Sequence, residues 1–517
     1  MVPPATGASS CARDRDHDAG SRSGIERVTP AGRQLNNTRA SISIVRPLMA
    51  APARSKSFDR SIVEGPLPRV VWHLAWPSML QNIIGGLQGV VDHAMVGHYV
   101  GYTGNAAIGV SWQIFLVVVV FISSLFAGMG VLVARFAGAN DHDNVNRTVY
   151  QAFLTAGALS VGIMAPLGYF LAPSLLGVVN ATPEVQAEAL PYLRIMFVFS
   201  FGMMTFFMLG GALRSAGDAQ TPLRLGIAMT VLNVILNVIL IRGLGPIPAL
   251  GTTGAALGTV ISGGLVSLVA IYLLFSGRLV VSIKVGSWKL DWSIIRELFR
   301  FGLPTGLQGI AMNVAGVMLL RFVGSLAQSA EAQAAYAVSY TELFSFITWT
   351  SIGLMSATAA VAGQNLGAGR PDRTVKAVQI ASWIGLAGAG FVGVLFLAIP
   401  RILLGAFGME DPVVIDLGVQ LLGFLSVSGL FVTVALIYTG GLQGTGDTRS
   451  PFYISLISQI ALPIGMCGVI QAIRGLQPSD IWLAILLGHL TRCLLSVLRF
   501  RQGKWRQIEI KVRPAGP

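Results

Sequence analysis

Charged residues are scarce in this chain, and their scarcity excludes an ordinary soluble fold. Asp, Glu, Lys and Arg make up 11% of the 517 residues and hydrophobic residues make up 53%, whereas soluble domains carry roughly a quarter charged residues. Apolar stretches of about 20 residues, the length that crosses the hydrocarbon layer, follow one another from Val71 to about Phe500. Lipid offers the backbone no hydrogen bonds and period-two alternation is absent, so these stretches are predicted to be helices.

Cysteine and the common catalytic motifs are also lacking. Cys11, Cys467 and Cys493 have no paired spacing, so the sequence supports neither a disulfide framework nor a zinc site. There is no Gly-x-x-x-x-Gly-Lys-Ser/Thr loop for ATP, no His-Glu-x-x-His motif and no Gly-x-Ser-x-Gly motif. We therefore expect no cofactor, no ATP and no enzymatic activity.

What the chain does contain is a series of twelve apolar runs separated by polar, Gly and Pro breaks. The predicted fold is an all-α integral membrane protein whose twelve helices form two parallel six-helix repeats around a central cavity. The predicted spans are 72–97, 106–134, 148–172, 190–213, 222–242, 252–276, 297–321, 334–362, 374–399, 413–440, 451–472 and 480–500.

The positive charge of the chain follows the predicted membrane topology. The formal net charge is +13, which also occurs in nucleic-acid-binding proteins, but the even-numbered connections carry thirteen Arg or Lys and the odd-numbered ones four. The positive-inside rule then places both termini in the cytoplasm. We expect a multi-pass protein of the bacterial plasma membrane that contacts lipid, binds no nucleic acid and is a monomer.

The segments outside the spans complete the predicted organisation. Residues 1–65 are predicted to be a disordered basic tail, with Met49 as an alternative start and an organellar transit segment as a weaker interpretation. A linker between two lobes and a cytoplasmic tail are also predicted. The ranges are 66–276 for the first six-helix lobe, 277–296 for the cytoplasmic linker, 297–500 for the second lobe and 501–517 for the tail.

The two lobes repeat one another at a constant offset along the chain. The matching pairs are 213–222 with 442–451, 138–141 with 367–370, and Pro183 with Pro412. Near the start of each lobe, Trp76-Pro77 matches Leu303-Pro304 with a slip of two positions. Parallel repeats of this kind enclose a central site and alternate its access by rocking of one half against the other. Asp218 and Asp447, in matching turns, are interpreted as turn-formers and helix caps.

Three motifs resemble the multidrug and toxic compound extrusion family of secondary transporters. They are Val-Asp-His-Ala-Met-Val-Gly at 91–97, Ala-Leu-Arg-Ser-Ala-Gly-Asp at 212–218, and Gly-Gln-Asn-Leu-Gly-Ala-Gly at 363–369. The resemblance covers residues 66–506 and implies export of amphipathic, often cationic organic compounds driven by a proton or sodium gradient. The expected partners are therefore small organic substrates.

A carboxylate inside a predicted span is the first candidate for ion coupling. An ionised Asp near the bilayer centre costs about 2.5–3.5 kcal/mol on insertion scales, and Asp92 lies in span one. By depth, Asn233 and Asn237 in span five and Thr259 in span six lie at a similar level. In the family, the span-one Asp is the coupling carboxylate, and the span-five pair and the span-six Thr help to bind the ion. Gln113 in span two is similarly deep and is a candidate residue of the substrate cavity.

The coupling ion is predicted to be H⁺ rather than Na⁺. The second span-five position is often Asp in the DinF-like branch of the family, whereas here it is Asn237. A lone carboxylate in an apolar site favours its protonated form, although Na⁺ at Asp92 and Asn237 stays an alternative. The NorM-like branch carries further carboxylates in spans seven and ten, and the corresponding stretches 307–313 and 431–435 have none here. The chain therefore looks closer to the DinF-like branch.

Two prolines and one acid complete the candidate residues. Pro77 is predicted to bend span one by removing a helix hydrogen bond, and Pro304 to do the same in span seven. Glu342 in span eight is a candidate for attracting cationic substrates in the cavity, or else a water-facing residue.

Two rival functions stay open. A flippase for a lipid-linked precursor would need cationic residues in its cavity, and Arg194 is the main deep candidate for such a residue. An integral membrane enzyme without a recognised motif is the other rival.

Overall fold

The computed structural model describes residues 57–179, 181–282 and 290–512, and within these ranges the chain is helical with no strand. The helices are α1 (Ser61–Glu64), α2 (Leu67–Tyr99), α3 (Tyr102–Gly138), α4 (His142–Leu159), η1 (Ser160–Met164), α5 (Ala165–Val178), α6 (Pro183–Val198), α7 (Ser200–Ser215), α8 (Gln220–Arg242), α9 (Gly251–Phe275), α10 (Trp292–Gly324), α11 (Ser329–Tyr336), η2 (Ala337–Leu343), α12 (Ser345–Gly367), α13 (Pro371–Ala398), α14 (Pro400–Gly405), α15 (Pro412–Thr445), α16 (Arg449–Ser455), η3 (Leu456–Ala461), α17 (Leu462–Arg474), α18 (Pro478–Arg501) and η4 (Lys504–Gln507).

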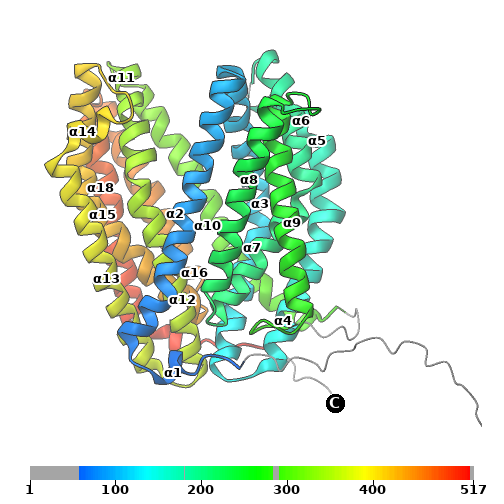
Figure 1. The fold of residues 1–517 in the computed structure, drawn as a ribbon. Helices are drawn as coiled ribbons and strands as arrows, with labels where there is room; N and C mark the ends of the chain where they lie inside the picture. The colour runs from blue at the N-terminus through cyan, green and yellow to red at the C-terminus, as the bar shows by residue number, and fades with distance from the viewer. Residues whose placement is uncertain (1–56, 180, 283–289, 513–517) are drawn as a thin grey trace, which may run out of the picture. The chain divides into compact units, whose positions relative to one another are not determined.

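The long helices lie side by side in two groups (Figure 1). Helices α13, α15 and α18 pack together on one side, and α5, α6 and α9 pack together on the other. Among the described residues, nine helical segments are long and apolar enough to cross a membrane, and the pair α6 and α7, bent by 54°, makes a tenth. Helix α2, with 33 residues, is long enough but is not in this count. The all-helical membrane fold is confirmed, and the number twelve stays a prediction.

Backbone conformation repeats between the two halves at the offset of the sequence repeat. Gly217 and its match Gly446 have φ of +103° and +100°. Asn140 and its match Gly369 have φ of +61° and +71°. Because the left-handed region disfavours residues with a Cβ, matching positions in it indicate matching turns rather than coincidence.

Asp218 and Asp447 cap the helices that follow these turns. Asp218 accepts hydrogen bonds from the backbone N–H and the hydroxyl of Thr221, at 3.0 and 2.6 Å. Asp447 accepts the equivalent pair from Ser450, at 3.2 and 2.9 Å. The second turn has an additional partner, because Arg499 of α18 forms an ion pair with Asp447 at 2.8 Å.

This difference predicts unequal effects of one substitution at the two sites. Asp218→Ala removes a cap and is expected to lower the free energy of unfolding by about 1 kcal/mol. Asp447→Ala also leaves Arg499 without its ion-pair partner, and it is expected to lower the free energy of unfolding by about 2–3 kcal/mol. Thermal unfolding of the purified variants in detergent measures both effects, and equal losses would contradict the role given to the ion pair.

The linker reaches the second half through Asp291, the N-cap of α10. Its carboxylate accepts hydrogen bonds from Ser293 and pairs with Arg147 of α4 at 2.7 Å. Burial raises the pKa of the Asp291 carboxyl, but the bonds from Ser293 and Arg147 outweigh burial and hold the pKa below its usual value. This contact therefore stabilises the fold at neutral pH and is lost as the pH falls through that lowered pKa.

The two halves meet through a reciprocal glycine contact at the end of the bundle where α1 lies, which we call the α1 end (Figure 1). A Cβ at Gly138 of α3 would overlap the carbonyl oxygen of Gln364, and a Cβ at Gly367 of α12 would overlap that of Arg135. In the sequence repeat Gly138 matches Gly367, and Arg135 matches Gln364. The contact therefore has the form of a two-fold pair, with backbone against backbone.

Hydrogen bonds extend this pairing across the same interface. Gln364 donates to the carbonyl of Ser215 in the first half at 2.8 Å. Arg135 donates to the carbonyls of Thr445 in the second half and Ile508 beyond it, each at 3.3 Å. These bonds join the two halves at the α1 end.

The last part of the predicted disordered tail is ordered instead. Residues 1–56 lie outside the described residues, but Phe58 and Ile62 are buried around α1. Phe58 stacks on His142 of the first half, with ring centroids 3.9 Å apart. Asn365, Arg370 and Arg373 of the second half donate to the carbonyls of Ile62, Val63 and Gly65 at 3.2, 2.7 and 2.7 Å. Apolar burial and these bonds together fix a segment that composition alone marks as polar.

The predicted tail after the last helix is also partly ordered. Trp505 in η4 is buried and stacks on Phe500, with ring centroids 5.1 Å apart. Its indole N–H donates to the carbonyl of Phe500 at 2.9 Å. One aromatic residue therefore anchors a segment that is otherwise basic.

Candidate functional site

Asp92 lies in the C-terminal part of α2, far from the α1 end. It follows Leu67, the first residue of this helix, by about 37 Å along the axis. Its side chain is half-buried and faces α8, where Asn233 and Asn237 are completely buried. A helical spacing of four puts these two amides on one face of α8.

A continuous chain of hydrogen bonds connects α9 to this carboxylate. The Thr259 hydroxyl accepts from Asn233 Nδ2 at 3.3 Å, and Asn233 Oδ1 accepts from Asn237 Nδ2 at 3.3 Å. Asn237 Nδ2 also donates to Asp92 Oδ1 at 2.7 Å. The structure thus brings together all four residues that the sequence placed at similar depth, and the carboxylate is the final acceptor of the chain.

Two further residues complete the surroundings of Asp92. A Cβ at Gly258 of α9 would overlap Asn237 Oδ1, so glycine is required for α8 and α9 to approach here. That oxygen is buried without a hydrogen-bond partner among the described residues. Tyr192 of α6 is buried and close enough to interact electrostatically with Asp92. Neither residue was predicted, because nothing in the sequence orients α6 or α9 toward α2.

The second half has no copy of this polar cluster in its sequence. Counted from the matching prolines, the residue that corresponds to Asp92 is Leu319. Counted from the matching turns, the residues that correspond to Asn233, Asn237 and Thr259 are Leu462, Met466 and Gly488. The site therefore belongs to the first half alone, although the backbone repeats.

The other predicted site residues lie apart from this cluster. Gln113 of α3 is exposed and makes no hydrogen bond to Asp92 among the described residues. Glu342 lies on η2 in the second half. Pro77 and Pro304 lie within α2 and α10, which continue through them. Their roles in bending and substrate attraction stay predictions.

Arg194, the predicted deep cation, lies against another side chain. Its guanidinium sits over the Tyr169 ring at 4.5 Å from the centroid, and its Nε donates to the Tyr169 carbonyl at 3.3 Å. Arg492 of α18 is the more deeply buried cation, with 5% of its surface exposed. Its place near the middle of the predicted span 480–500 was a usable signal for it, and the sequence interpretation named Arg194 instead.

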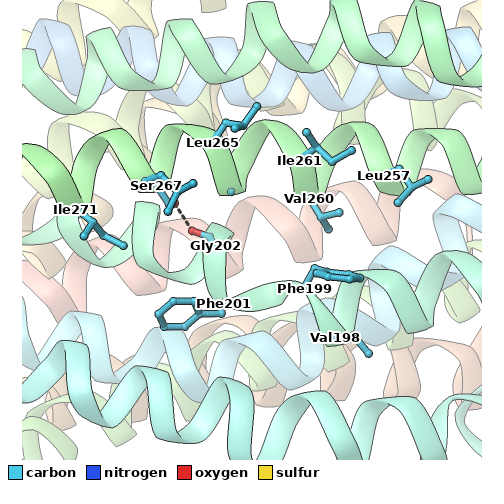
Figure 2. A pocket seen from close by; sticks show the side chains of 12 residues that line it. Val198, Phe199, Phe201, Gly202, Leu257, Val260, Ile261, Leu265, Ser267 and Ile271 are labelled. Carbon is cyan, nitrogen blue, oxygen red and sulfur yellow. Dashed lines mark hydrogen bonds between the residues drawn. The ribbon is translucent and has the colours of Figure 1, made fainter.

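An apolar cavity of about 460 Å³ opens beside the break between α6 and α7 (Figure 2). Phe199 and Phe201 line it from the break, and Leu257, Ile261 and Leu265 line it from α9. The one hydrogen bond drawn across it, from Ser267 to the Gly202 carbonyl, ties α9 to α7 (Figure 2). None of the predicted site residues lines this cavity, so it is separate from the Asp92 cluster.

Comparison with known protein families identifies the fold and its class of activity. The MatE family model matches residues 77–239 and matches again at 304–467, more than half of the chain. The chain belongs to the MatE family. It is therefore a multi-pass membrane transporter and not an enzyme, and the family resemblance carried by the three motifs is confirmed. The MatE model begins twice at the two matching prolines, Pro77 and Pro304.

Curated relatives cover most of this MatE chain at low identity. The probable multidrug resistance protein NorM of Thermotoga maritima is 26% identical over 444 residues, which is 85% of this chain and 93% of the relative. The multidrug export protein MepA of Staphylococcus aureus is 24% identical over 446 residues, or 84% and 96%.

Solved structures share the MatE fold. One, described as the outward-facing conformation of a multidrug resistance MATE family transporter, has a TM-score of 0.79 at 20% identity and covers 88% of this chain and 100% of its own. A transporter from Pyrococcus furiosus has a TM-score of 0.79 at 21% identity, with the same coverage. At this identity the likeness concerns the fold alone.

Proposed function

We propose that this chain is a secondary active antiporter that exports amphipathic, often cationic organic compounds in exchange for H⁺ by alternating access. Its MatE membership and the names of its relatives, which are multidrug resistance and export proteins, support the class of substrate. We infer that its twelve spans form two six-helix lobes in the plasma membrane, with both termini in the cytoplasm. The lack of carboxylates at 307–313 and 431–435 supports the DinF-like branch.

The observation that carries the proposal is the hydrogen bond from Asn237 to Asp92. In the observed arrangement the amide N–H donates, which suits an ionised carboxylate. A protonated Asp92 gains an O–H donor, while its other oxygen still accepts. The Asn237 oxygen, which has no hydrogen-bond partner among the described residues, is available to accept from that O–H when the amide turns. Turning the amide breaks its bond to Asn233, and the change passes along α8 toward α9. Proton binding is thereby linked to the packing of α2, α8 and α9.

The same bond supports H⁺ over Na⁺ as the coupling ion. A hard cation requires several oxygen ligands around it. Beside Asp92, however, a cation would meet the N–H of Asn237, while the Asn237 oxygen faces the backbone at Gly258. One carboxylate with amide donors around it serves a proton better than a metal ion.

Close packing at the α1 end supports alternating access. The reciprocal contact of Gly138 and Gly367 brings the two halves together there, backbone against backbone. The solved relative described as outward-facing shares this fold. We therefore interpret the present form as one that is closed toward the cytoplasm.

Exchanging the driving gradient tests the proposal. Purified protein in liposomes, supplied with ethidium, is expected to move the dye when a proton gradient is imposed and not when an equal sodium gradient is imposed. Liposomes without protein provide the baseline, and collapse of the proton gradient by a protonophore should stop transport. Transport driven by sodium alone would reassign the ion, and transport independent of both gradients would refute antiport.

A further inference from the structure

A buried cation with no ion-pair partner in the described part of the chain lies in the middle of α18. Arg492 follows Pro478, the first residue of this helix, by about 21 Å along the axis, and is 5% exposed. Its Nε is buried without a hydrogen-bond partner among the described residues. An unpaired charge inside a membrane span is costly, and it marks a functional site more often than a structural one.

No acid of α18, of the turn before α16 or of η2, which carries Glu342, forms an ion pair with this guanidinium in the described part of the chain. Asp447 pairs with Arg499 at 2.8 Å, and Asp480 pairs with Arg474 at 2.6 Å. The group from a facing helix that interacts electrostatically with Arg492 is the phenol of Tyr340 on η2. A compensating negative charge must therefore come from a molecule outside this part of the chain.

Other unsatisfied polar groups surround the same stretch of α18. Both ring nitrogens of His489 are buried without a partner within the described ranges, and His489 is 3% exposed. Gln459 Nε2, also unpartnered there, would lie 3.5 Å from a Cβ at Gly488, the residue before His489. The guanidinium, the Gln459 amide N–H and one imidazole N–H are donors, and a charged donor with neutral donors beside it is complementary to an anion. The other imidazole nitrogen is an acceptor, as is the Ser496 hydroxyl, which also lacks a partner there.

An aromatic wall lies against these donors. Tyr336, Tyr340 and Phe344 stack along α11 and η2, with successive ring centroids 4.9 and 5.5 Å apart. Phe344 lies 5.8 Å from the His489 ring, and Tyr336 lies 6.2 Å from the Trp482 ring. The wall includes a π-helical segment, which occurs frequently at functional sites. Such surroundings suit an aromatic, amphipathic ligand rather than a fully hydrated one.

The two halves therefore carry charges of opposite sign at the polar positions that lack a match in the other half. The residues that match His489 and Arg492 in the first half are Val260 and Gly263, just as the matches of Asp92 and its partners are apolar in the second half. The first half holds the Asp92 carboxylate and the second half holds the Arg492 guanidinium, and neither forms an ion pair in the described part of the chain. A solute with an acidic group finds a buried and unpartnered cation in the second half.

We propose that Arg492 and His489 form a site for the carboxylate of an amphipathic aromatic solute. The planar guanidinium matches a carboxylate in a two-bond fork. A single cation leaves a doubly charged phosphate undercompensated, which favours the carboxylate. That such solutes are transported rests on the proposed function, but binding does not, because it needs no gradient.

Equilibrium binding to purified protein in detergent tests this site. The probe is 1-pyrenebutyrate, and 1-pyrenebutanol is its uncharged counterpart. Quenching of tryptophan fluorescence reports binding of both. Arg492→Gln is expected to weaken binding of the acid by roughly tenfold or more, the loss of a charge-assisted bond, and to leave binding of the alcohol unchanged. His489→Leu is expected to weaken binding of the acid severalfold.

A matched control and a second measurement separate binding from a structural role. Arg401→Gln, which removes an exposed Arg paired with Asp416, should change neither probe. Because an unpaired buried charge destabilises the fold, Arg492→Leu is expected to melt at a higher temperature than the parent when no probe is present. A lower melting temperature, failure to fold, equal weakening of acid and alcohol, or displacement of the acid by inorganic phosphate more readily than by acetate would each overturn the proposal.

Discussion

Asp92→Asn is expected to reduce export driven by a proton gradient to the level of liposomes without protein. The amide is similar in size to the carboxylic acid and can accept the hydrogen bond from Asn237, but it cannot take up or release a proton. The free energy of unfolding is expected to fall by no more than about 1 kcal/mol, the typical net contribution of one hydrogen bond. Dye transport in proteoliposomes and thermal unfolding measure the two quantities separately.

Asp416→Asn is the matched control for this substitution. Asp416 is also in a long helix of the bundle, but its side chain is exposed and pairs with Arg401 at 3.0 Å. Its neutralisation should leave gradient-driven transport unchanged, because exposed ion pairs contribute little. Undiminished export by Asp92→Asn would show that the coupling proton binds elsewhere, and a loss in both variants would point to a general effect of lowered charge.

Gly367→Ala is expected to reduce transport severalfold and to lower the free energy of unfolding by about 2 kcal/mol or more. The added methyl group meets the backbone carbonyl of Arg135, which cannot move aside as a flexible side chain would. Either α3 and α12 separate, or the α1 end no longer closes. Labelling of an introduced cysteine near Ser215 would then become faster, and thermal unfolding would shift to lower temperature.

Gly388→Ala supplies the comparison for this packing effect. Gly388 lies in α13, and nothing is within 4 Å of the position where its Cβ would be. Alanine favours a helix over glycine by roughly 0.5–1 kcal/mol, so this variant should be slightly more stable and transport normally. Gly138→Ala should behave like Gly367→Ala, since the two glycines occupy equivalent places. Normal labelling and transport in both would exclude a role for this contact in closure.

The sequence predicted the Asp92 cluster because depth in a span can be counted along a helix. Asn233 and Asn237 share a face by their spacing, and the level of Asp92 follows from its distance to the ends of its span. Rotation of each helix about its axis cannot be counted in this way. Gln113 has the right depth and is nevertheless exposed apart from the cluster, whereas Tyr192, which interacts electrostatically with Asp92, was missed.

The sequence predicted the matching turns of the two halves but not the charged side chains in which the halves differ. Gly217 and Gly446 require a left-handed backbone, so the same residue type recurs at both places. The charges of Asp92 and Arg492 answer to no such backbone constraint, and neither recurs at the matching position of the other half. That Arg492 lacks an acidic partner depends on Asp447 and Asp480 being engaged elsewhere, which only the three-dimensional arrangement of the described residues reveals.

The order of α1 was not predictable for a related reason. Phe58 and Ile62 are isolated apolar residues in a polar stretch, and isolated apolar residues do not indicate a core. Their burial comes from surfaces on helices far away in the sequence, including His142. The hydrogen bonds from Arg370 and Arg373 go to backbone carbonyls, which any sequence of residues at that place would supply.

The contacts of α1 are divided unevenly between the halves. Carbonyl groups in and next to it accept hydrogen bonds from Asn365, Arg370 and Arg373 of the second half, while its contacts with the first half are apolar and aromatic, with Ile62 against Gly217 and Phe58 stacked on His142. If the two halves separate at this end, the ring stacking on His142 should break before the three side-chain hydrogen bonds to the second half. The α1 segment, which precedes the first half in the sequence, would then move together with the second half.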